Sequence, residues 1–236
     1  MYLKLGKSSK VLFYVSVGRD MSRPGSDMWG ATQPNRQAFL QSIGLSDRKL
    51  AYMYVQYGSE IQGANGSGMY ARDALWTIKK DVVLGLSTAD CFPVLVEGKD
   101  RVGLVHAGWQ SIAQGIFPKL FQAWGVARHS PELESISLVF GPGICREHYF
   151  VLEPQQLKDP ETRREWLPFM QSKEGDLLWA VDLVGFMRKQ VTDYGITEAN
   201  VSVSEFCTYE HPDMFPSYQR KAGDKASRFM SVVALT

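Results

Sequence analysis

Residues 81–109 read DVVLGLSTADCFPVLVEGKDRVGLVHAGW and carry the strongest strand signals in this chain of 236 residues. Three apolar runs, Val82–Leu86, Phe92–Val96 and Val102–Val105, have the length and the branched side chains of buried strands. The residues EGKD at 97–100 separate the last two runs and favour a turn. We therefore expect the second and third runs to form an antiparallel hairpin.

This hairpin would bring a cysteine and a histidine together. If Gly98 and Lys99 form a two-residue turn, Cys91 lies directly across from His106. Facing side chains of an antiparallel pair have Cβ atoms about 4.5–5.5 Å apart, so the thiolate and the imidazole could share a metal ion. Pro93 prevents a fully regular ladder here, because proline has no backbone N–H to donate.

Hydrophobic periodicity elsewhere predicts a chain that mixes strands and helices. Further strands are expected at Val11–Val17, Ala51–Tyr57, Ser135–Phe140, Val201–Phe206 and Phe229–Leu235. Helices are expected behind a capping Thr32, along Ile112–Trp124, within residues 153–172, and from Val181 to a stop at Gly195. Pro118 is expected to kink or shorten the second of these helices. Segments 18–33 and 58–70 contain several glycines and are expected to be loops. Neither an internal repeat nor a linker is visible, so residues 1–236 are expected to form a single domain.

Composition and charge exclude several classes of protein. Lys and Arg number 26 against 25 Asp and Glu, so bulk charge does not favour binding to nucleic acid. We expect no membrane span, because no stretch of about 18–20 uncharged apolar residues occurs. We expect no signal peptide either, because no convincing cleavage site follows Val11–Val17. The odd, widely spaced set of Cys91, Cys145 and Cys207 favours a reducing, cytoplasmic location over disulfides.

Cys91 and His106 are the candidate catalytic residues. A lone cysteine is most often buried and inert, and a histidine at the end of a strand is often a satisfied core residue. As a pair, they fit a zinc or copper site. They also fit a nucleophile with its general base, and the residues alone leave both interpretations open.

Other polar residues give weaker signals. Gly141-Pro142-Gly143 follows a strand and could cradle an anion through backbone N–H groups. Arg220 and Arg228 near the C-terminus could bind phosphate or merely be solvated, and the sequence alone does not distinguish these alternatives. Cys145 and Cys207 have no partner at metal-ligand spacing, so we expect them to be structural.

The chain resembles the YfiH or laccase-domain family at two motifs, TADCFPV at residues 88–94 and VHAGW at residues 105–109. The resemblance continues at Asn35-Arg36, Gly141-Pro142-Gly143-Ile144, Tyr149, Val151, Phe206-Cys207-Thr208, Phe215, Ser217-Tyr218, Arg220, Arg228 and Ser231. It covers nearly the whole chain in order and spacing. Members of this family have been called polyphenol oxidases and are now viewed as purine nucleoside phosphorylases.

The resemblance implies an α+β fold, a single-domain layered sandwich with two packed mixed β-sheets flanked by helices. It implies phosphorolysis of adenosine, inosine, guanosine or methylthioadenosine, with phosphate as co-substrate, and deamination of adenosine. The implied metal is zinc, held by two histidines and a cysteine with one position left open. Copper is less expected, because the chain has only four histidines. The implied ligand is a purine nucleoside, and the implied assembly is a monomer or small homo-oligomer.

Carried onto this sequence, the resemblance assigns the metal to Cys91 and His106. The expected substrate-binding residues are Tyr57, Asp90, Trp109, Gly141, Arg220 and Arg228.

The sequence departs from the family pattern beside this site. Tyr57 stands in Val55-Gln56-Tyr57-Gly58, where the family has its first histidine ligand. A tyrosine binds metal as phenolate, which its reference pKa of about 10 disfavours. His148 is a hypothetical replacement for the missing ligand. Gln110-Ser111 replaces an Arg-Gly pair and removes a positive charge.

Two alternatives therefore stay open beside the phosphorylase. One is a diverged member that lacks one metal ligand and acts as a binding module. The other is a metal-free hydrolase, with Cys91 as nucleophile and His106 as base.

Overall fold

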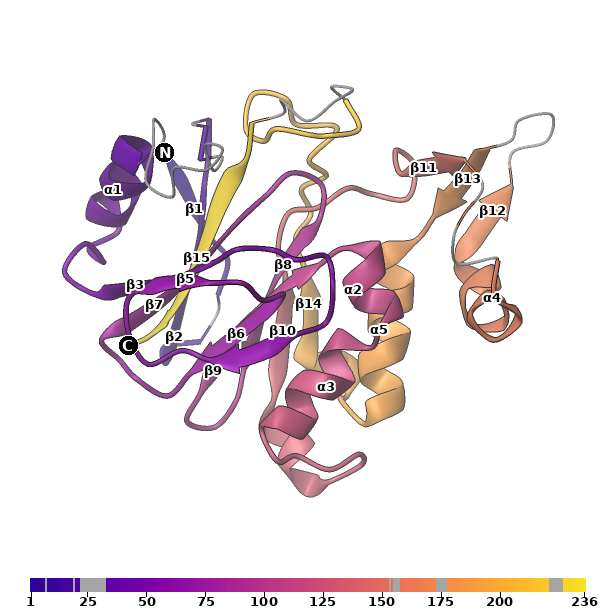
Figure 1. Cartoon of the computed structure of the whole chain (residues 1–236), viewed down its shortest axis with the longest axis horizontal. Helices are drawn as coiled ribbons and strands as arrows, with labels where there is room; N and C mark the ends of the chain where they lie inside the picture. Colours follow the sequence, from indigo (N-terminus) through magenta and orange to yellow (C-terminus); the bar gives the residue numbers. More distant parts are fainter. Residues whose placement is uncertain are drawn as a thin grey trace.

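The computed structural model describes residues 1–6, 8–18, 20–21, 33–152, 154, 158–172, 178–220 and 227–236. Within these residues, two six-stranded sheets pack together, and a smaller three-stranded sheet lies to one side (Figure 1). The expected strand at Phe229–Leu235 is confirmed, and those at Val82, Phe92 and Val102 each extend one or two residues further than predicted.

The first sheet has the strand order β1-β2-β15-β7-β3-β5. Its strands are β1 (Tyr2–Lys4), β2 (Val11–Ser16), β15 (Phe229–Leu235), β7 (Val82–Thr88), β3 (Lys49–Met53) and β5 (Gly68–Tyr70). Strand β3 pairs in parallel with both β7 and β5, whereas the other pairs are antiparallel. The sheet is therefore mixed.

The second sheet has the strand order β14-β10-β8-β9-β6-β4. Its strands are β14 (Val201–Val203), β10 (Ser137–Phe140), β8 (Phe92–Glu97), β9 (Val102–Ala107), β6 (Ala74–Thr77) and β4 (Ile61–Gly63). The outer pairs β10–β14 and β4–β6 are parallel, and the inner pairs are antiparallel. The expected fold class, two packed mixed sheets flanked by helices, is confirmed.

Alternation of side chains along the strands creates the layers. On β9, Val102 and Leu104 pack against the first sheet, whereas Val105 and Ala107 pack against helices. Because successive side chains of a strand point to opposite faces, His106 belongs to the face between the sheets. Thr88, the last residue of β7, is on the same face of its strand as Leu84 and Leu86, which lie in the core between the two sheets.

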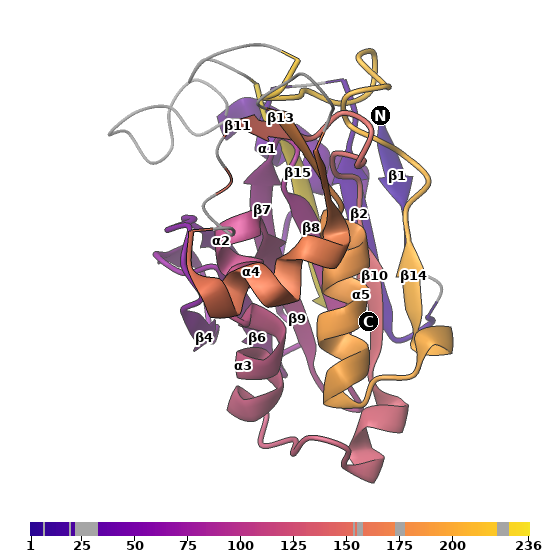
Figure 2. The ribbon, with the colours of Figure 1, turned by 90° about the vertical axis from the view of Figure 1, so that its right-hand side faces the viewer.

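Helices cover both outer faces. Helix α1 (Gln33–Ser42) packs on the first sheet through Phe39 and Leu40. Helices α2 (Trp109–Ala113), α3 (Ile116–Ala123) and α5 (Leu183–Tyr194) cover the second sheet, and Figure 2 shows α3 and α5 in front of its strands. Helix α5 ends at Gly195, as predicted, because φ there is 122° and favours glycine.

The third sheet has the order β11-β13-β12 and forms an extension at the right of Figure 1. It contains β11 (Phe150–Leu152), β12 (Met170–Ser172) and β13 (Leu178–Val181), with α4 (Pro160–Trp166) and a 3-10 turn at Leu167–Phe169. The Trp166 ring stacks on Phe186 of α5 with centroids 3.8 Å apart. This stacking attaches the extension to the main body. Two further 3-10 turns lie at Pro131–Ser135 and Glu198–Asn200.

Two predictions about local structure are wrong. Residues 58–70 are not one loop, because they contain the short strands β4 and β5. The expected single helix along Ile112–Trp124 is two helices, since Gly115 adopts a left-handed φ of 73° between them. Pro118 does not kink α3, because it lies in the first turn, where no helical partner for its N–H is needed; the helix that contains it is shorter than expected. The capping role predicted for Thr32 lies outside the described residues.

The predicted register of the central hairpin is also wrong. Pro93, not Cys91, pairs with His106, and the Gly98 N–H donates to the Arg101 carbonyl at 2.9 Å across a four-residue connection. A two-residue hairpin turn needs positive φ at its first central residue, and neither Gly98 nor Lys99 has it. Cys91 therefore precedes β8 and is a diagonal neighbour of His106.

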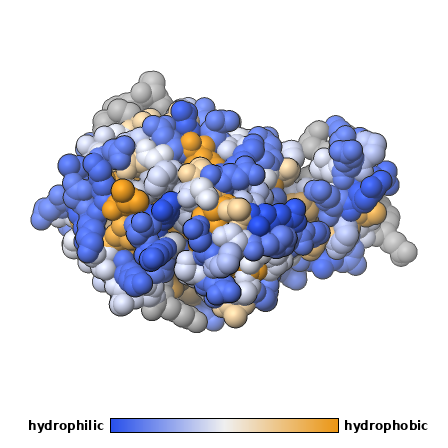
Figure 3. Space-filling model, turned by 90° about the horizontal axis from the view of Figure 1, so that it is seen from below, coloured by the Kyte–Doolittle hydropathy of each residue, from blue (hydrophilic) through white to orange (hydrophobic). Residues whose placement is uncertain are grey.

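The surface seen from below is largely polar, with small apolar patches separated by charged residues (Figure 3). None of the helices in the described part of the chain has the length and apolarity that crossing a bilayer requires.

Candidate functional site

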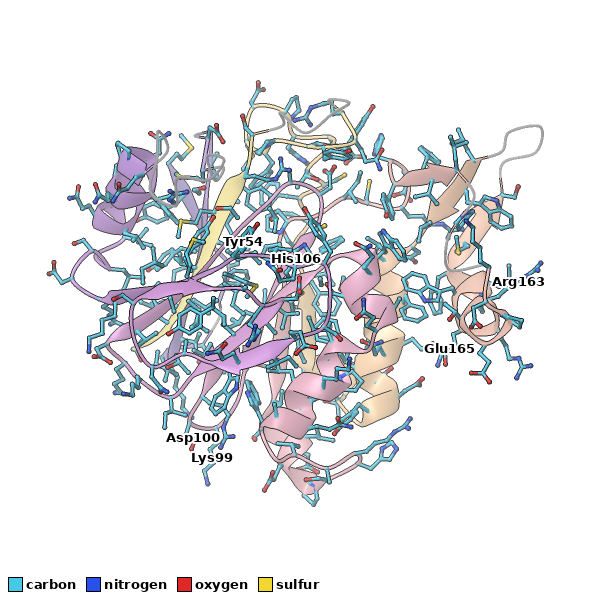
Figure 4. All side chains as sticks on the ribbon, in the orientation of Figure 1. Tyr54, Lys99, Asp100, His106, Arg163 and Glu165 are labelled. Carbon is cyan, nitrogen blue, oxygen red and sulfur yellow. The ribbon has the colours of Figure 1, made fainter. Side chains whose placement is uncertain are left out.

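A pocket of about 450 Å³ opens where several strands of both sheets begin or end. Its walls come from the ends of β7 and β9, the residue before β8, the segment after β3 and the residue before β15. The lining residues are Val55, Tyr57, Ser87, Thr88, Ala89, Asp90, Cys91, His106, Gly108, Trp109, Gln110, Ser111, Tyr149, Tyr218, Gln219 and Arg228. Figure 4 shows His106 far from Lys99 and Asp100, at the opposite end of the hairpin from its turn.

Cys91 and His106 meet at the floor of this pocket. A Cβ atom placed on Gly108 would lie 3.1 Å from Cys91 Sγ and 3.5 Å from His106 Nε2. The thiol and the imidazole thus converge over Gly108, which has to be small for both to fit. The sulfur is also a hydrogen-bond partner of the imidazole. The pair is brought together as expected, although by a diagonal rather than a facing register.

Asp73, which the sequence analysis did not identify, orients His106. Its carboxylate is fully buried, lies 3.2 Å from His106 Nδ1, and accepts the N–H groups of Tyr57 and Gly58 at 2.9 Å each. With Nδ1 held by Asp73, Nε2 faces Cys91. This carboxylate–histidine arrangement commonly supports metal ligands and general bases. The one available signal was an acidic residue directly before the buried strand β6.

The protonation of His106 and of Asp73 depends on their neighbours. Burial by itself would lower the pKa of His106, but the Cys91 charge and the hydrogen bond to Asp73 raise it to about 9. Burial would raise the pKa of Asp73, yet hydrogen bonds from His106 and from Gly58 hold it below its usual value. The imidazole is therefore protonated at neutral pH unless a metal displaces the Nε2 proton.

Tyr57 covers His106 without offering a good metal donor. The two rings meet edge to face, with centroids 5.7 Å apart and an interplanar angle of 83°. Burial, followed by the Cys91 charge, raises the pKa of Tyr57, so the phenol is protonated at neutral pH. Cys91 sulfur and His106 nitrogen suit zinc chemically, but they are one donor short of the three protein ligands usual at catalytic zinc.

The suggestion that His148 replaces the missing ligand is wrong. Its Nδ1 lies 3.1 Å from Cys145 Sγ and 3.4 Å from Glu210 Oε1, in a separate cluster. Its ring stacks on Tyr209 with centroids 4.3 Å apart, which holds it there.

Asp90 lines the pocket, but its carboxylate is already engaged. Its two oxygens accept the Thr208 hydroxyl and the Gln219 N–H, each at 2.7 Å. Its φ of 80° is rare for a residue with a side chain. The structure thus gives Asp90 a positioning role, holding the turn that presents Cys91.

Aromatic and hydroxyl groups form the rest of the wall. Trp109, a predicted substrate-binding residue, lines the pocket, and so do Tyr149 and Tyr218, which were not predicted to bind substrate. Among the described residues, the buried hydroxyls of Thr88 and Ser111 have no hydrogen-bond partner. Because buried polar atoms nearly always have partners, these two hydroxyls are exceptions in the wall of the pocket.

The structure separates the two predicted arginines. Arg228 lines the pocket, and its charge offsets part of the rise in the Tyr57 pKa. Arg220 lies outside the lining, where its guanidinium donates to the carbonyls of Thr208 and Tyr209 at 2.7 Å and of Phe215 at 2.6 Å. Arg220 therefore braces the chain before β15.

Gly141 also lies outside the pocket lining. Its N–H donates to the Pro93 carbonyl at 2.9 Å, and a Cβ there would lie 2.8 Å from that oxygen. Glycine is needed here for close packing of the end of β10 against β8.

The prediction that Cys145 and Cys207 lack metal-ligand partners is wrong. Ligand atoms of Cys145, His148, Cys207 and Glu210 all lie within 4.8 Å of one another, so this cluster could hold a metal ion. Burial, followed by the hydrogen bond and charge of Cys207, raises the pKa of the Cys145 thiol. The sequence separation of the two cysteines concealed the cluster, which a parallel bridge between Gly143 and Cys207 assembles.

Several proteins of similar sequence carry the same name, purine nucleoside phosphorylase. A purine nucleoside phosphorylase from Aquifex aeolicus is 34% identical over 167 residues, which are 69% of this chain and 71% of that protein. One from Deinococcus radiodurans is 29% identical over 204 residues, covering 85% and 76%. Purine nucleoside phosphorylase YlmD from Bacillus subtilis is 27% identical over 171 residues, and this chain spans only 60% of its length.

Solved structures share the fold. The crystal structure of Bacillus licheniformis YfiH superposes with a TM-score of 0.78 at 23% identity, covering 96% of this chain and 93% of that one. YlmD from Geobacillus stearothermophilus gives 0.79 at 21% identity, covering 96% and 92%. The family model described as multi-copper polyphenol oxidoreductase laccase matches residues 11–236. This chain therefore belongs to that laccase-like family, which includes YfiH and YlmD.

Proposed function

We propose that this protein is a purine nucleoside phosphorylase acting on adenosine, inosine, guanosine and methylthioadenosine, with adenosine deaminase activity and with zinc at Cys91 and His106. The observation that carries the proposal is the pocket in which this pair, backed by Asp73, faces aromatic walls. Its volume of about 450 Å³ is in the range of small-molecule sites. The names of the relatives support the same reaction.

The aromatic side chains suit the base of the substrate. Trp109, Tyr149 and Tyr218 offer ring faces, and stacking on an aromatic side chain contributes about 1–3 kcal/mol per base. Thr88 and Ser111 also line the pocket, and they bring uncharged polar side chains to its wall. Uncharged polar groups on apolar walls match a nucleoside better than a nucleotide.

Phosphorolysis requires an anion beside the ribose. A phosphate oxygen forms a bond to C1′ as the bond from C1′ to the purine nitrogen breaks. The electron pair leaves with the base, which takes up a proton. Arg228 supplies positive charge at the pocket wall, so we assign phosphate binding to it.

Cys91 Sγ and His106 Nε2 are the atoms that would hold zinc, and Asp73 would fix the imidazole through Nδ1. Bound zinc would supply a polarised, more acidic water, which is the chemistry that deamination of a purine requires. Because only two protein donors are present, we expect zinc to bind more weakly than at a three-ligand site.

Two observations favour the two alternative functions. Cys91, His106 and Asp73 also form a nucleophile, a base and an orienting carboxylate, which is the arrangement of a metal-free hydrolase. Tyr57 in the place of a ligand favours the binding-module alternative.

Purine release from the four nucleosides, measured with and without phosphate, separates these functions. Zinc-loaded protein should release base only when phosphate is present, and Cys91→Ala should abolish the release. Release without phosphate and without metal would favour the hydrolase. Nucleoside binding in a calorimeter without any turnover would favour the binding module.

The proposal places the protein in the cytoplasm, since the free thiol of Cys91 in the pocket stays reduced there. It also includes a monomer or small homo-oligomer as the assembly. Size-exclusion chromatography with light scattering measures the assembly.

A further inference from the structure

Two chain segments meet behind the pocket to form the second cluster. Strands β10 and β14 pair in parallel, so the residues that follow them emerge side by side. The Thr208 N–H donates to the Gly143 carbonyl at 2.9 Å, and the Cys145 N–H donates to Cys207 Sγ at 3.2 Å. These backbone contacts hold the two cysteines together independently of any ligand.

Each segment presents a cysteine and a second donor three residues later. The first segment reads Cys145-Arg146-Glu147-His148, and the second reads Cys207-Thr208-Tyr209-Glu210. Short spacings of this kind, with two residues between ligands, recur in structural zinc sites. We propose that Cys145, His148, Cys207 and Glu210 form a structural zinc site, separate from Cys91 and His106.

The distances fit a tetrahedral ion. With zinc–sulfur bonds of about 2.3 Å and zinc–nitrogen or zinc–oxygen bonds of about 2.0–2.2 Å, neighbouring ligand atoms lie about 3.3–3.8 Å apart. Cys145 Sγ lies 3.1 Å from His148 Nδ1 and 3.9 Å from Glu210 Oε1, and His148 Nδ1 lies 3.4 Å from Glu210 Oε1. These three separations bracket the tetrahedral range, and Cys207 Sγ lies within 4.8 Å of each of these ligand atoms, so a modest contraction of the cluster would complete the site.

The donors are held in place and reachable from solvent. Stacking on Tyr209, with an interplanar angle of 13°, fixes the His148 ring. Cys207 is buried, with 5% of its surface exposed, whereas 49% of the Glu210 side chain is exposed. Two thiols and a carboxylate with one imidazole form the donor set of a closed zinc site rather than of a calcium or magnesium site.

The site connects to the pocket through Thr208. Its hydroxyl holds the Asp90 carboxylate, and Asp90 precedes Cys91. Tyr149, a wall of the pocket, follows His148 directly. Zinc at the second site would therefore clamp two segments that position the pocket.

The test measures zinc binding by the reduced, metal-free, full-length chain, titrated against a chromophoric chelator. The variant Cys91→Ser/His106→Asn should bind one zinc ion per chain. Adding Cys145→Ser should weaken this binding on the order of 100-fold or more. His129→Asn is the matched control, a loop histidine outside both clusters whose φ of 57° suits asparagine, and should change nothing.

Cobalt gives a readout that a merely misfolded variant would not reproduce. Co²⁺ in this site should show thiolate-to-metal charge-transfer absorption, which Cys207→Ser reduces. Glu210→Gln keeps both thiols, so it should retain this absorption while binding the metal more weakly. If the double variant fails to fold, wild-type protein and Cys145→Ser are compared instead, and the stoichiometry should fall by one.

Two results would overturn the inference. One is a folded Cys91→Ser/His106→Asn variant that binds no zinc. The other is a Cys145–Cys207 disulfide in the purified protein whose reduction yields a chain that takes up no zinc at this cluster.

Discussion

Replacing Tyr57 with histidine should give the pocket metal its third protein donor. Tyr57 has a φ of 59°, a region that histidine tolerates better than most residues. Its N–H stays hydrogen-bonded to Asp73 at 2.9 Å whatever the side chain is. The Tyr57 ring centroid lies 5.7 Å from that of His106, and two imidazoles on one zinc ion lie about 5 Å apart. A histidine at this position can therefore reach the same ion.

The expected gain follows from the energetics of zinc sites. Four-ligand structural sites bind zinc with about 10–16 kcal/mol, which is roughly 3 kcal/mol for each ligand. A third donor should therefore lower the zinc dissociation constant of the pocket by on the order of 100-fold. In the natural chain, the protonated phenol of Tyr57 contributes little to the free energy of zinc binding.

Competition with a chromophoric chelator measures the change, in a Cys145→Ser/Cys207→Ser background that removes both thiols of the second site. Tyr57→Phe is the matched control, because it removes the hydroxyl and adds no donor. Phosphorolysis at limiting zinc should rise in Tyr57→His alone. Equal zinc affinity in Tyr57→His and Tyr57→Phe would refute the claim that a missing donor at position 57 limits the site.

Three further predictions address the neighbouring residues. Asp73→Asn should lower zinc affinity and kcat/KM by roughly 10–100-fold, because the carboxylate that holds His106 Nδ1 is lost; steady-state kinetics and zinc titration test it. Arg228→Ala should raise the phosphate KM. Arg220→Ala should leave the phosphate KM unchanged but lower the free energy of unfolding by about 2–4 kcal/mol, because Arg220 donates to three carbonyls. A phosphate KM that rises in Arg220→Ala and not in Arg228→Ala would reverse the assignment. The folded pKa of His106, about 9, exceeds its unfolded value of about 6.5, so protonation stabilises the metal-free fold fully below pH 6.5. That stability, up to about 3 kcal/mol, should be lost as pH rises through 9, and urea unfolding in a chelating buffer should show no such loss in His106→Gln.

The sequence predicted those parts of the site that lie close together along the chain. Cys91 and His106 flank one hairpin, so their meeting could be inferred from a turn signal between two apolar runs. The register was missed by two residues, because turn length depends on backbone φ values that a sequence such as EGKD does not specify. Cys91 and His106 meet despite that error, because a shift of two residues keeps both side chains on the same face of the sheet and makes them diagonal neighbours.

Residues joined by distant pairings were not predictable in this way. Asp73 reaches His106 because β6 and β9 pair, and the second cluster exists because β10 and β14 pair in parallel. Neither pairing leaves a local pattern in the sequence. Strands β4 and β5 were missed because each has only three residues, one of them a glycine, too few for a period of two to be visible.

Phosphorus NMR of zinc-loaded protein with inosine and inorganic phosphate tests the central claim most directly. The account predicts that the inorganic phosphate signal declines while a sugar phosphate signal grows, that proton NMR of the same sample shows an equal amount of free hypoxanthine, and that Cys91→Ala shows no change in either spectrum. Hypoxanthine that grows while the phosphate signal stays constant would contradict phosphorolysis, and so would an unchanged spectrum from protein shown to contain zinc in the pocket.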